Sequence, residues 1–354
     1  KSCGYPNDLP IISYDFQAPI GEFGQLNESY DIIKIMNIFL NDFGCRLAPM
    51  ISVLPDKQPS ALTDNETLRF AVRVKDDTGF IFVNNYQRHF NMKNIEKLQI
   101  KLQLKNEMLT VPNRPFILKQ GEYFILPFNF NMGKVLLKYS TTQLLSRINH
   151  NDEEYLFFFT PQGLEPEYVF AHDGIQKVEA LDAKIEEIHS NVCISDFKPG
   201  TGSIIKLIDE TDKKFNIITL TKQQALCFYK GDVWGKERVF ITKANIMFNG
   251  NDLELFGTEP DKMEFSVFPN ASRNICSEND SIDSYMDGIF SKYIFNVSQK
   301  KIDIKVKLCL GSNQIISTVE KTHEKSHLIA YIEIPEDAFS DINDLFLHID
   351  YIGD

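Results

Sequence analysis

The stretch TLRFAVRVKDDTGFIFVNNY at positions 67–86 decides the class of fold. Its two halves, 67–74 and 80–86, are short runs rich in β-branched and aromatic residues, which favour strands over helices. The segment DDTG at 76–79 separates them, and a short run of Asp and Gly between two such halves is a hairpin signal. The stretch therefore predicts a pair of antiparallel strands.

Similar runs follow along the rest of the chain, separated by turn residues. We expect strands at 98–104, 124–130, 134–140, 155–160, 167–171, 202–208, 214–220, 238–248, 263–268, 301–310, 327–335 and 344–352. A short helix is expected at 221–229, and the polar stretch 270–284 is the best linker candidate. The grouping predicts a mainly β fold, with antiparallel domains at 46–171 and 172–270 and a third set of strands at 271–354.

One helix is well signalled near the start of the chain. It is expected from Asn27, a capping residue, to Gly44, a helix terminator, with an acidic first turn between them. Apolar residues recur along it at helical spacing, so the helix is amphipathic and needs a surface on which to pack. The recurring residues are Ile32, Ile35, Met36, Phe39 and Phe43.

Composition limits the classes of function. A chain of 354 residues exceeds the roughly 100 to 200 residues of one ordinary domain, which predicts two or three domains. The net charge of −12, with acidic residues spread along the chain, disfavours a nucleic-acid partner. No apolar run reaches the ~18 residues of a membrane span, so no membrane partner is expected. Residues 1–10 lack the layout of a signal peptide, which leaves both a cytoplasmic and a secreted location open.

The sequence carries none of the signatures of the common cofactor-dependent or nucleophilic enzymes. Phosphate-loop and dinucleotide fingerprints are missing, so we expect no cofactor. The motif GxSxG is missing as well, and the seven His are scattered. The six Cys lie far apart without a CxxC pair, which predicts no metal site and fits buried or free thiols.

Three polar features have both a functional and a structural interpretation. Glu165 and Glu167, spaced like residues on one face of a strand, could form a carboxylate pair, as could Asp15 and Glu22. The cluster at 84–89 follows an apolar strand and fits a strand end whose side chains bond to the backbone. The single tryptophan, Trp234, could stack on a sugar but fits a core or an interface better. The structural interpretation is favoured for all three.

The segment SYDFQAPIGEFG at 13–24 resembles a motif of the β-galactosidases of glycoside hydrolase family 35, S-Y-D-Y-D-A-P-[LI]-x-E-x-G. In that family the motif closes the catalytic barrel and leads into a helix, as the expected helix does here. Later stretches resemble members of the family too, so the similarity spans the chain. They are 79–89, 126–145, 163–170, 234–241 and 345–354.

The resemblance implies a specific architecture and mechanism. Residues 1–45 would be the last strand and helix of a (β/α)8 barrel, followed by tandem antiparallel β-sandwich-like domains and a partial jelly-roll-like domain at 271–354. Family members hydrolyse terminal β-linked galactose by a retaining mechanism with two glutamates on barrel strands. Both glutamates would lie upstream, so we expect no catalytic residue in this segment and no activity from it alone. Lys1 is not a methionine and the chain stops on an expected strand, so we expect it to be part of a longer protein.

The same motif supplies the candidate substrate-binding residues Tyr14, Asp15 and Phe16. Tyr14 and Asp15 match the family, whereas Phe16 stands where the family places a tyrosine that contacts galactose, and Gln17 replaces the following Asp. The missing hydroxyl removes a hydrogen bond worth about 1 kcal/mol or more, which puts the sugar preference in doubt.

Three roles for the β domains stay open at this point. They could be the accessory part of a β-galactosidase-like hydrolase that acts on a β-galactoside, a carbohydrate-binding module, or a purely architectural brace for the barrel. The excess of 28 Phe over 13 Tyr favours the architectural role over a sugar platform. Without a barrel, we expect the helix to expose Ile32, Ile35, Met36 and Phe39, which would allow oligomerisation.

Overall fold

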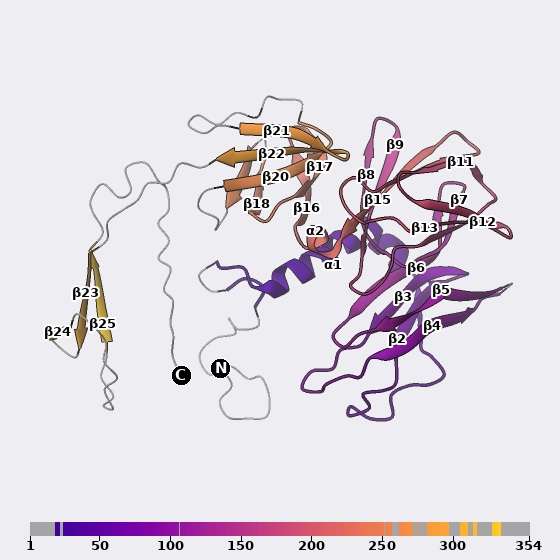
Figure 1. Ribbon diagram of the computed structural model, residues 1–354, viewed down its shortest axis with the longest axis horizontal. Helices are drawn as coiled ribbons and strands as arrows, with labels where there is room; N and C mark the ends of the chain where they lie inside the picture. The colour runs from indigo at the N-terminus through magenta and orange to yellow at the C-terminus, as the bar shows by residue number, and fades with distance from the viewer. Residues whose placement is uncertain are drawn as a thin grey trace. The chain divides into compact units, whose positions relative to one another are not determined.

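The computed structural model contains two compact units, residues 1–296 and 297–354, which are described separately. The described residues are 18–21, 24–105, 107–250, 252–256, 262–271, 275, 282–296 and the backbone of 305–310, 314–316 and 328–333. Most of them form strands, and Figure 1 shows several sheets together with one long helix in the first unit. The mainly β prediction is confirmed.

The expected long helix is α1, Glu28–Leu47. Asn27 occupies the N-cap position, and its side chain donates a hydrogen bond to the carbonyl of Ala18 at 2.6 Å. The expected end at Gly44 is wrong, because the helix runs through that glycine for three more residues. Leu47 packs against the core and thereby extends the helix.

The expectation that α1 exposes one whole apolar stripe is wrong for two of its four residues. Ile35 and Phe39 are buried against the β-sheets, and Phe39 is only 1% exposed. Ile32 and Met36 are exposed as expected. The helix therefore lays one apolar side on the β domain and leaves the other side open.

Eight strands form the largest sheet, in the order β1-β2-β3-β6-β7-β10-β13-β12, and every neighbouring pair is antiparallel. The predicted hairpin lies at one side of it, with Lys75 opposite Thr78 across a two-residue turn. The strands are β1 Ile51–Val53, β2 Arg69–Lys75, β3 Thr78–Asn84, β6 Tyr123–Met132, β7 Val135–Ser140, β10 Tyr168–Ala171, β12 Lys184–Ile188 and β13 Asn191–Ser195.

A second sheet of five strands packs face to face with the first, in the order β11-β14-β15-β9-β8. Its pairs are antiparallel except β9 and β15, which run parallel. Phe39 and Phe43 of α1 join the core between the two sheets, where Phe39 meets the ring of Phe80 edge-on at 5.4 Å. The strands are β8 Gln143–His150, β9 Glu153–Thr160, β11 Ile175–Ala180, β14 Ile204–Asp209 and β15 Lys214–Thr221.

The outer face of the eight-stranded sheet is covered by a separate ribbon of two strands, β4 Ile95–Gln103 and β5 Met108–Leu118. Strand β5 was not expected from the sequence, because Pro112 and Pro115 interrupt its pattern. A two-stranded ribbon needs only half of the backbone donors of a central strand, so it accommodates both prolines.

The outer face of the five-stranded sheet packs against α1 and a third sheet, β16-β17-β20-β22-β21. The short helix expected at 221–229 is α2, Lys222–Leu226, which is shorter than expected because strand β16 begins at Phe228. Thr221 closes a capping box with Gln224 at its start. The expected strand at 238–248 is two strands, because the side chain of Thr242 accepts from the Ala244 N–H and turns the chain. The strands are β16 Phe228–Val233, β17 Lys236–Ile241, β18 Asn245–Asn249, β19 Asp252–Phe256, β20 Lys262–Phe268, β21 Ile282–Asp287 and β22 Phe290–Asn296.

The second unit contains one antiparallel sheet in the order β24-β23-β25. Two of the expected runs, 301–310 and 327–335, contain β23 and β25, and the run at 344–352 lies outside the described residues. The strands are β23 Lys305–Leu310, β24 Gln314–Ile316 and β25 Leu328–Glu333.

The sheets cross two of the boundaries expected from the sequence. The boundary between 171 and 172 runs between paired strands, since β10 pairs with β13 and β9 with β15. The linker expected at 270–284 overlaps β21, which pairs with β22. The last strand of a catalytic barrel, expected before residue 18, lies outside the described residues.

Candidate functional site

The substrate-binding residues expected from the sequence, Tyr14, Asp15 and Phe16, lie outside the described residues. The same holds for Glu22 of the carboxylate pair expected with Asp15. The candidate site is therefore built from the part of the chain that the structure places.

The second carboxylate pair does not form, because Glu165 and Glu167 lie in different environments just before β10. Glu165 is exposed, whereas Glu167 is buried and accepts a hydrogen bond from the hydroxyl of Tyr139 at 2.5 Å. Burial, reinforced by that carboxylate, raises the pKa of Tyr139, which holds the hydroxyl as a donor. The structural interpretation is confirmed for Glu167, and the expectation of a shared face is wrong.

The polar cluster at 84–89 is a strand end, as favoured from the sequence. The Asn84 side chain accepts from the Tyr86 N–H at 2.8 Å and donates to the Tyr86 carbonyl at 3.2 Å. The buried Asn85 amide donates to the carbonyls of Lys93 and Lys119, both at 3.0 Å. These bonds end β3 and fix the loop that follows it.

Trp234 belongs to a small core, which agrees with the structural interpretation. It lies in the turn between β16 and β17, is partly buried, and meets the ring of Phe240 edge-on at 6.3 Å. The guanidinium of the buried Arg238 lies 5.4 Å from the Trp234 ring. A stacked sugar would have to compete with these contacts.

The described residues hold no group of three or more His, Cys, Asp or Glu that could bind a metal ion. Three cysteines have described side chains and all three are free thiols: Cys45 is exposed, Cys193 buried and Cys227 partly buried. Burial raises the pKa of Cys193 to about 11, so its thiol stays protonated at neutral pH. A membrane-spanning helix is not found in the described part of the chain, where neither α1 nor α2 combines the length and the hydropathy required.

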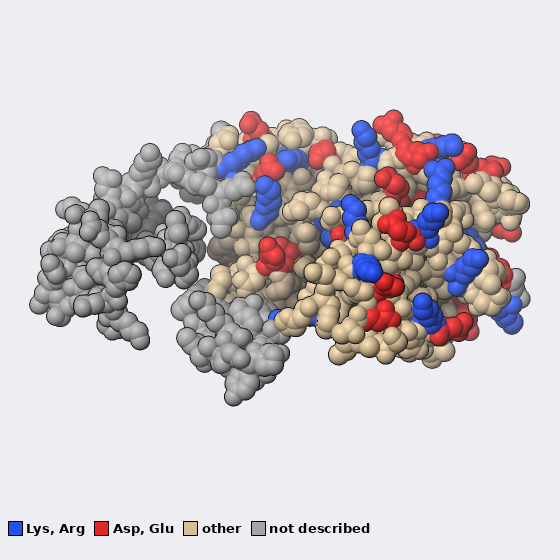
Figure 2. Space-filling view, turned by 60° about the horizontal axis from the view of Figure 1, so that its bottom comes forward, with Lys and Arg blue, Asp and Glu red and all other residues tan. Residues whose placement is uncertain are grey.

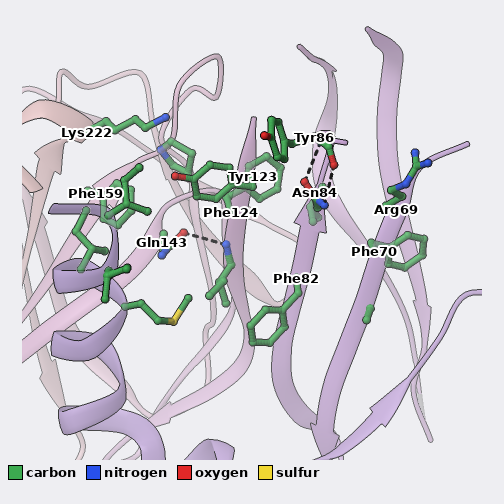
Figure 3. A pocket seen from close by; sticks show the side chains of 18 of the residues that line it. Arg69, Phe70, Phe82, Asn84, Tyr86, Tyr123, Phe124, Gln143, Phe159 and Lys222 are labelled. Atoms are coloured by element: carbon green, nitrogen blue, oxygen red, sulfur yellow. Dashed lines mark hydrogen bonds between the residues drawn. The ribbon is translucent and has the colours of Figure 1, made fainter. Parts of the chain in front are cut away.

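A groove of about 830 Å³ lies between α1, α2 and the edge of the sandwich (Figure 3). Its walls are mostly aliphatic and aromatic, and its charged or amide-bearing lining residues are Arg69, Asn84, Gln143 and Lys222. The lining residues come from α1 (Ile32, Ile33, Ile35, Met36), β2 and β3 with the next loop (Arg69, Phe70, Ala71, Phe82, Val83, Asn84, Tyr86), β6 (Tyr123, Phe124, Ile125), β8 and β9 with the next loop (Gln143, Phe159, Pro161) and α2 (Lys222, Leu226).

Gln143 is the buried polar residue of the groove. On strand β6, the residues that pair with β7 run from Phe128 to Met132. Ile125 precedes this paired stretch, so β7 supplies no partner for its N–H. The side-chain oxygen of Gln143 accepts a hydrogen bond from that N–H at 2.9 Å and so joins the two sheets of the sandwich. The side-chain nitrogen of Gln143 remains for another acceptor (Figure 3).

Lys222 and two tyrosines border the groove. The Lys222 ammonium lies 3.5 Å from the carboxylate of Glu122 and 5.7 Å from the centre of the Tyr123 ring. Burial raises the pKa of Tyr123, so its hydroxyl is neutral at physiological pH. Tyr86 and Tyr123 are both about half-exposed, which gives the mouth an amphipathic border.

The outward side of α1 continues the apolar wall of the groove. Ile32, Ile33, Met36 and Leu40 are each about 40% exposed, and the first three also line the groove. Elsewhere on the described surface in Figure 2, Lys and Arg side chains are interspersed with Asp and Glu. An uncharged surface of this kind on a well-packed helix is typical of an interface.

Polar contacts fix the inward side of α1. The Asp42 carboxylate accepts from the Ser146 hydroxyl at 2.6 Å, from the Arg147 N–H at 2.9 Å and from the Lys230 ammonium at 2.6 Å. These three partners come from β8 and β16, so one side chain joins the helix to two sheets. No sequence pattern indicates this junction, because its members are more than 80 positions apart.

A comparison with known protein families finds a match that covers most of the sandwich. Residues 55–228 match the family described as beta-galactosidase, domain 2. The matched range contains helix α2 and strands β2 through β15. These strands make up the covering ribbon and all of the two facing sheets except β1. Helix α1 precedes the match, although its aromatic residues belong to the same core.

Proposed function

Because residues 55–228 belong to the β-galactosidase domain 2 family, we propose that this chain is the accessory part of a β-galactosidase-like glycoside hydrolase. In the complete enzyme a catalytic barrel, whose last strand and helix fall within residues 1–45, hydrolyses terminal β-linked galactose by a retaining mechanism. The two catalytic glutamates lie in that barrel and not in these 354 residues. The chain alone does not turn over substrate.

Within that enzyme we assign the chain an architectural role. The observation that carries it is the division of α1 into two apolar sides, one buried in the sandwich and one open. Phe39 and Phe43 are each 1% exposed, whereas Ile32 and Ile33 are each 44% exposed. A helix anchored on one side and apolar on the other is suited to connect two domains rigidly.

The anchoring makes α1 a strut and not a flexible linker. Asp42 joins it to β8 and β16, and the ammonium of Lys34 lies 3.6 Å from the centre of the Tyr229 ring on β16. Arg46, near the end of the helix, donates to the Asn131 carbonyl at 2.9 Å. A domain packed on the open side of α1 would therefore hold a fixed orientation to the sandwich.

A carbohydrate-binding role has one supporting observation, the half-exposed rings of Tyr86 and Tyr123 at the mouth of the groove. Such rings can stack on a sugar face. The deep walls of the groove are apolar, however, and would leave sugar hydroxyls without partners. The architectural role therefore has the stronger support.

The test is an activity assay on two proteins. The 354-residue chain and a version extended upstream through a whole barrel are each given an aryl β-galactoside. We expect turnover from the longer protein only. Turnover by the short chain, or none by the long one, would contradict the proposal.

A matched pair of variants tests the architectural part in the longer protein. Ile33→Asp puts a charge on the open side of α1, and Leu62→Asp does the same to an exposed residue of a loop. We expect Ile33→Asp to separate the melting transitions of the barrel and the β domains, and Leu62→Asp to leave them shared. Equal behaviour of the two variants would argue against docking through α1.

A further inference from the structure

We propose that the groove beside α1 receives an apolar polypeptide segment of the catalytic domain, and that the side-chain amide of Gln143 donates a hydrogen bond to a backbone carbonyl of that segment. The inference rests on the function proposed above and adds the chemistry by which the partner is recognised. It makes Gln143 a binding residue of the domain interface.

The first observation is the unused donor of Gln143. The residue is only 8% exposed, and its oxygen is already engaged by the Ile125 N–H. Within the described part of the chain no hydrogen bond is formed by its nitrogen, and in Figure 3 the dashed line starts from the oxygen of Gln143 and not from the nitrogen. This nitrogen still reaches solvent through the groove, so an occupant that displaces the solvent is expected to bring an acceptor in its place.

The second observation concerns the walls around that donor. Ile35, Phe82, Phe124 and Phe159 line the same groove with apolar surface, and its volume of about 830 Å³ can hold several side chains. A polypeptide segment offers both components, since it carries apolar side chains and one carbonyl at every residue. A sugar would leave several hydroxyls against apolar walls for each one that Gln143 satisfies.

The third observation identifies the source of the segment. Ile32, Ile33 and Met36 belong both to the groove and to the open side of α1, so one partner can cover both surfaces. Residues 18–21 precede α1 and are held at its start by Asn27. The Asn27 side chain donates a hydrogen bond to the Ala18 carbonyl, and its backbone N–H donates to the Pro19 carbonyl. A domain attached upstream is therefore tethered beside the groove at high effective concentration.

Photo-crosslinking in the longer, barrel-containing protein tests the occupant. The photoreactive residue p-benzoylphenylalanine replaces Ala71, which lines the groove, and in a control it replaces the exposed Ala61. We expect peptides of the barrel to be captured from position 71 and not from position 61. Capture confined to residues 46–296, or the same barrel peptides from both positions, would overturn the proposal.

Gln143→Glu tests the hydrogen bond. The variant keeps an oxygen for the Ile125 N–H and replaces the donor by a second acceptor. We expect the yield of the position-71 crosslink to fall about tenfold, the factor that one hydrogen bond at a buried site typically contributes. An unchanged yield would remove Gln143 from the interface.

A variant that fills the groove tests the proposal independently, should Gln143→Glu not fold. Ala71→Phe narrows the groove without removing a polar contact, and Ala61→Phe is its control. In the longer protein we expect Ala71→Phe to increase hydrogen exchange along Ile32–Met36, whereas Ala61→Phe leaves it unchanged. Equal exchange in both would contradict occupation of the groove.

Titration of the 354-residue chain with galactobiose separates the sugar alternative. A saturable calorimetric signal that Tyr123→Ala abolishes would assign the groove to a glycan and overturn the inference. The absence of a signal supports the polypeptide as the occupant of the groove.

The crosslinking and activity assays distinguish failure of this inference from failure of the proposed function. Turnover of an aryl galactoside with crosslinks outside the barrel would contradict this inference alone. Barrel crosslinks without turnover would contradict only the proposed function.

Discussion

The two apolar sides of α1 differ in what covers them. On the inward side Phe39 and Phe43 are buried in the core between the two facing sheets. On the outward side Ile33, Met36 and Leu40 stay about 40% exposed, although they are as apolar. The difference teaches that helical periodicity identifies apolar surface but does not say which part of the protein covers it.

Removing an inward side chain is expected to give the largest effect. Phe39→Ala deletes a ring that packs on Phe43 and Phe80, which costs about 3–5 kcal/mol of unfolding free energy. Met36→Ala, on the outward side, is expected to stay within about 0.5 kcal/mol in the 354-residue chain. Urea denaturation of both variants measures the contrast, and similar losses would mean that the outward side is packed in solution.

Loss of the polar anchor is expected to have an intermediate effect. Asp42→Ala leaves the Ser146 hydroxyl, the Arg147 N–H and one contact of the Lys230 ammonium without their acceptor. We expect a loss of about 1–3 kcal/mol by urea denaturation, since unsatisfied buried donors are costly. The neighbouring exposed residue supplies the control, because Asn41→Ala removes none of these contacts. A loss of unfolding free energy no larger than that of the control would contradict this prediction. It would mean that the ion pair of Lys230 with Glu237, at 3.0 Å, compensates for the missing carboxylate.

The smallest expected effect is a pH dependence that begins at Lys34. Burial lowers the pKa of Lys34, although the Asp31 carboxylate opposes the shift. The folded pKa then lies below the unfolded value of 10.5, so between these two pKa values the unfolded chain binds more protons and stability rises with pH. Relative to Lys34→Met, the wild-type chain is expected to gain stability as the pH is raised from its folded pKa toward about 10, where unfolded tyrosines begin to ionise.

Thermal melts across that pH range measure the dependence. Lys75→Met, an exposed lysine on β2, serves as the control and is expected to follow the wild-type chain. A wild-type stability that falls relative to Lys34→Met over the same range would mean that the charged ammonium is stabilised by its position above Tyr229. Tyr229 itself has a raised pKa because it is buried, so it titrates in the folded chain only above this range.

Local signals in the sequence predicted the elements that local chemistry determines. The hairpin around Asp76, the N-cap at Asn27 and a short helix after Thr221 are as expected, because each depends on residues within a few positions. The structural interpretations of Glu167 and Trp234 were also correct. These features need no knowledge of what packs against them.

Features that depend on distant partners could not be predicted. The buried state of Ile35 and Phe39 depends on sheets that follow later in the chain, and periodicity alone does not distinguish them from Ile32 and Met36. The Asp42 junction joins residues more than 80 positions apart. Gln143 looks like an ordinary strand residue until the groove around it is known. The candidate site is therefore a product of tertiary packing.

The parallel pairing of β9 with β15 has a consequence for the order in which the chain folds. Every residue of β9 from Glu153 to Thr160 pairs with one of β15 from Lys214 to Thr221, some 61 positions later. During synthesis β9 therefore has a free edge until β11 to β14 have left the ribosome, and long-range pairing of this kind slows folding. Fragments that end near residue 171 would keep that edge, rich in phenylalanine, exposed to other chains, so aggregation is their expected fate.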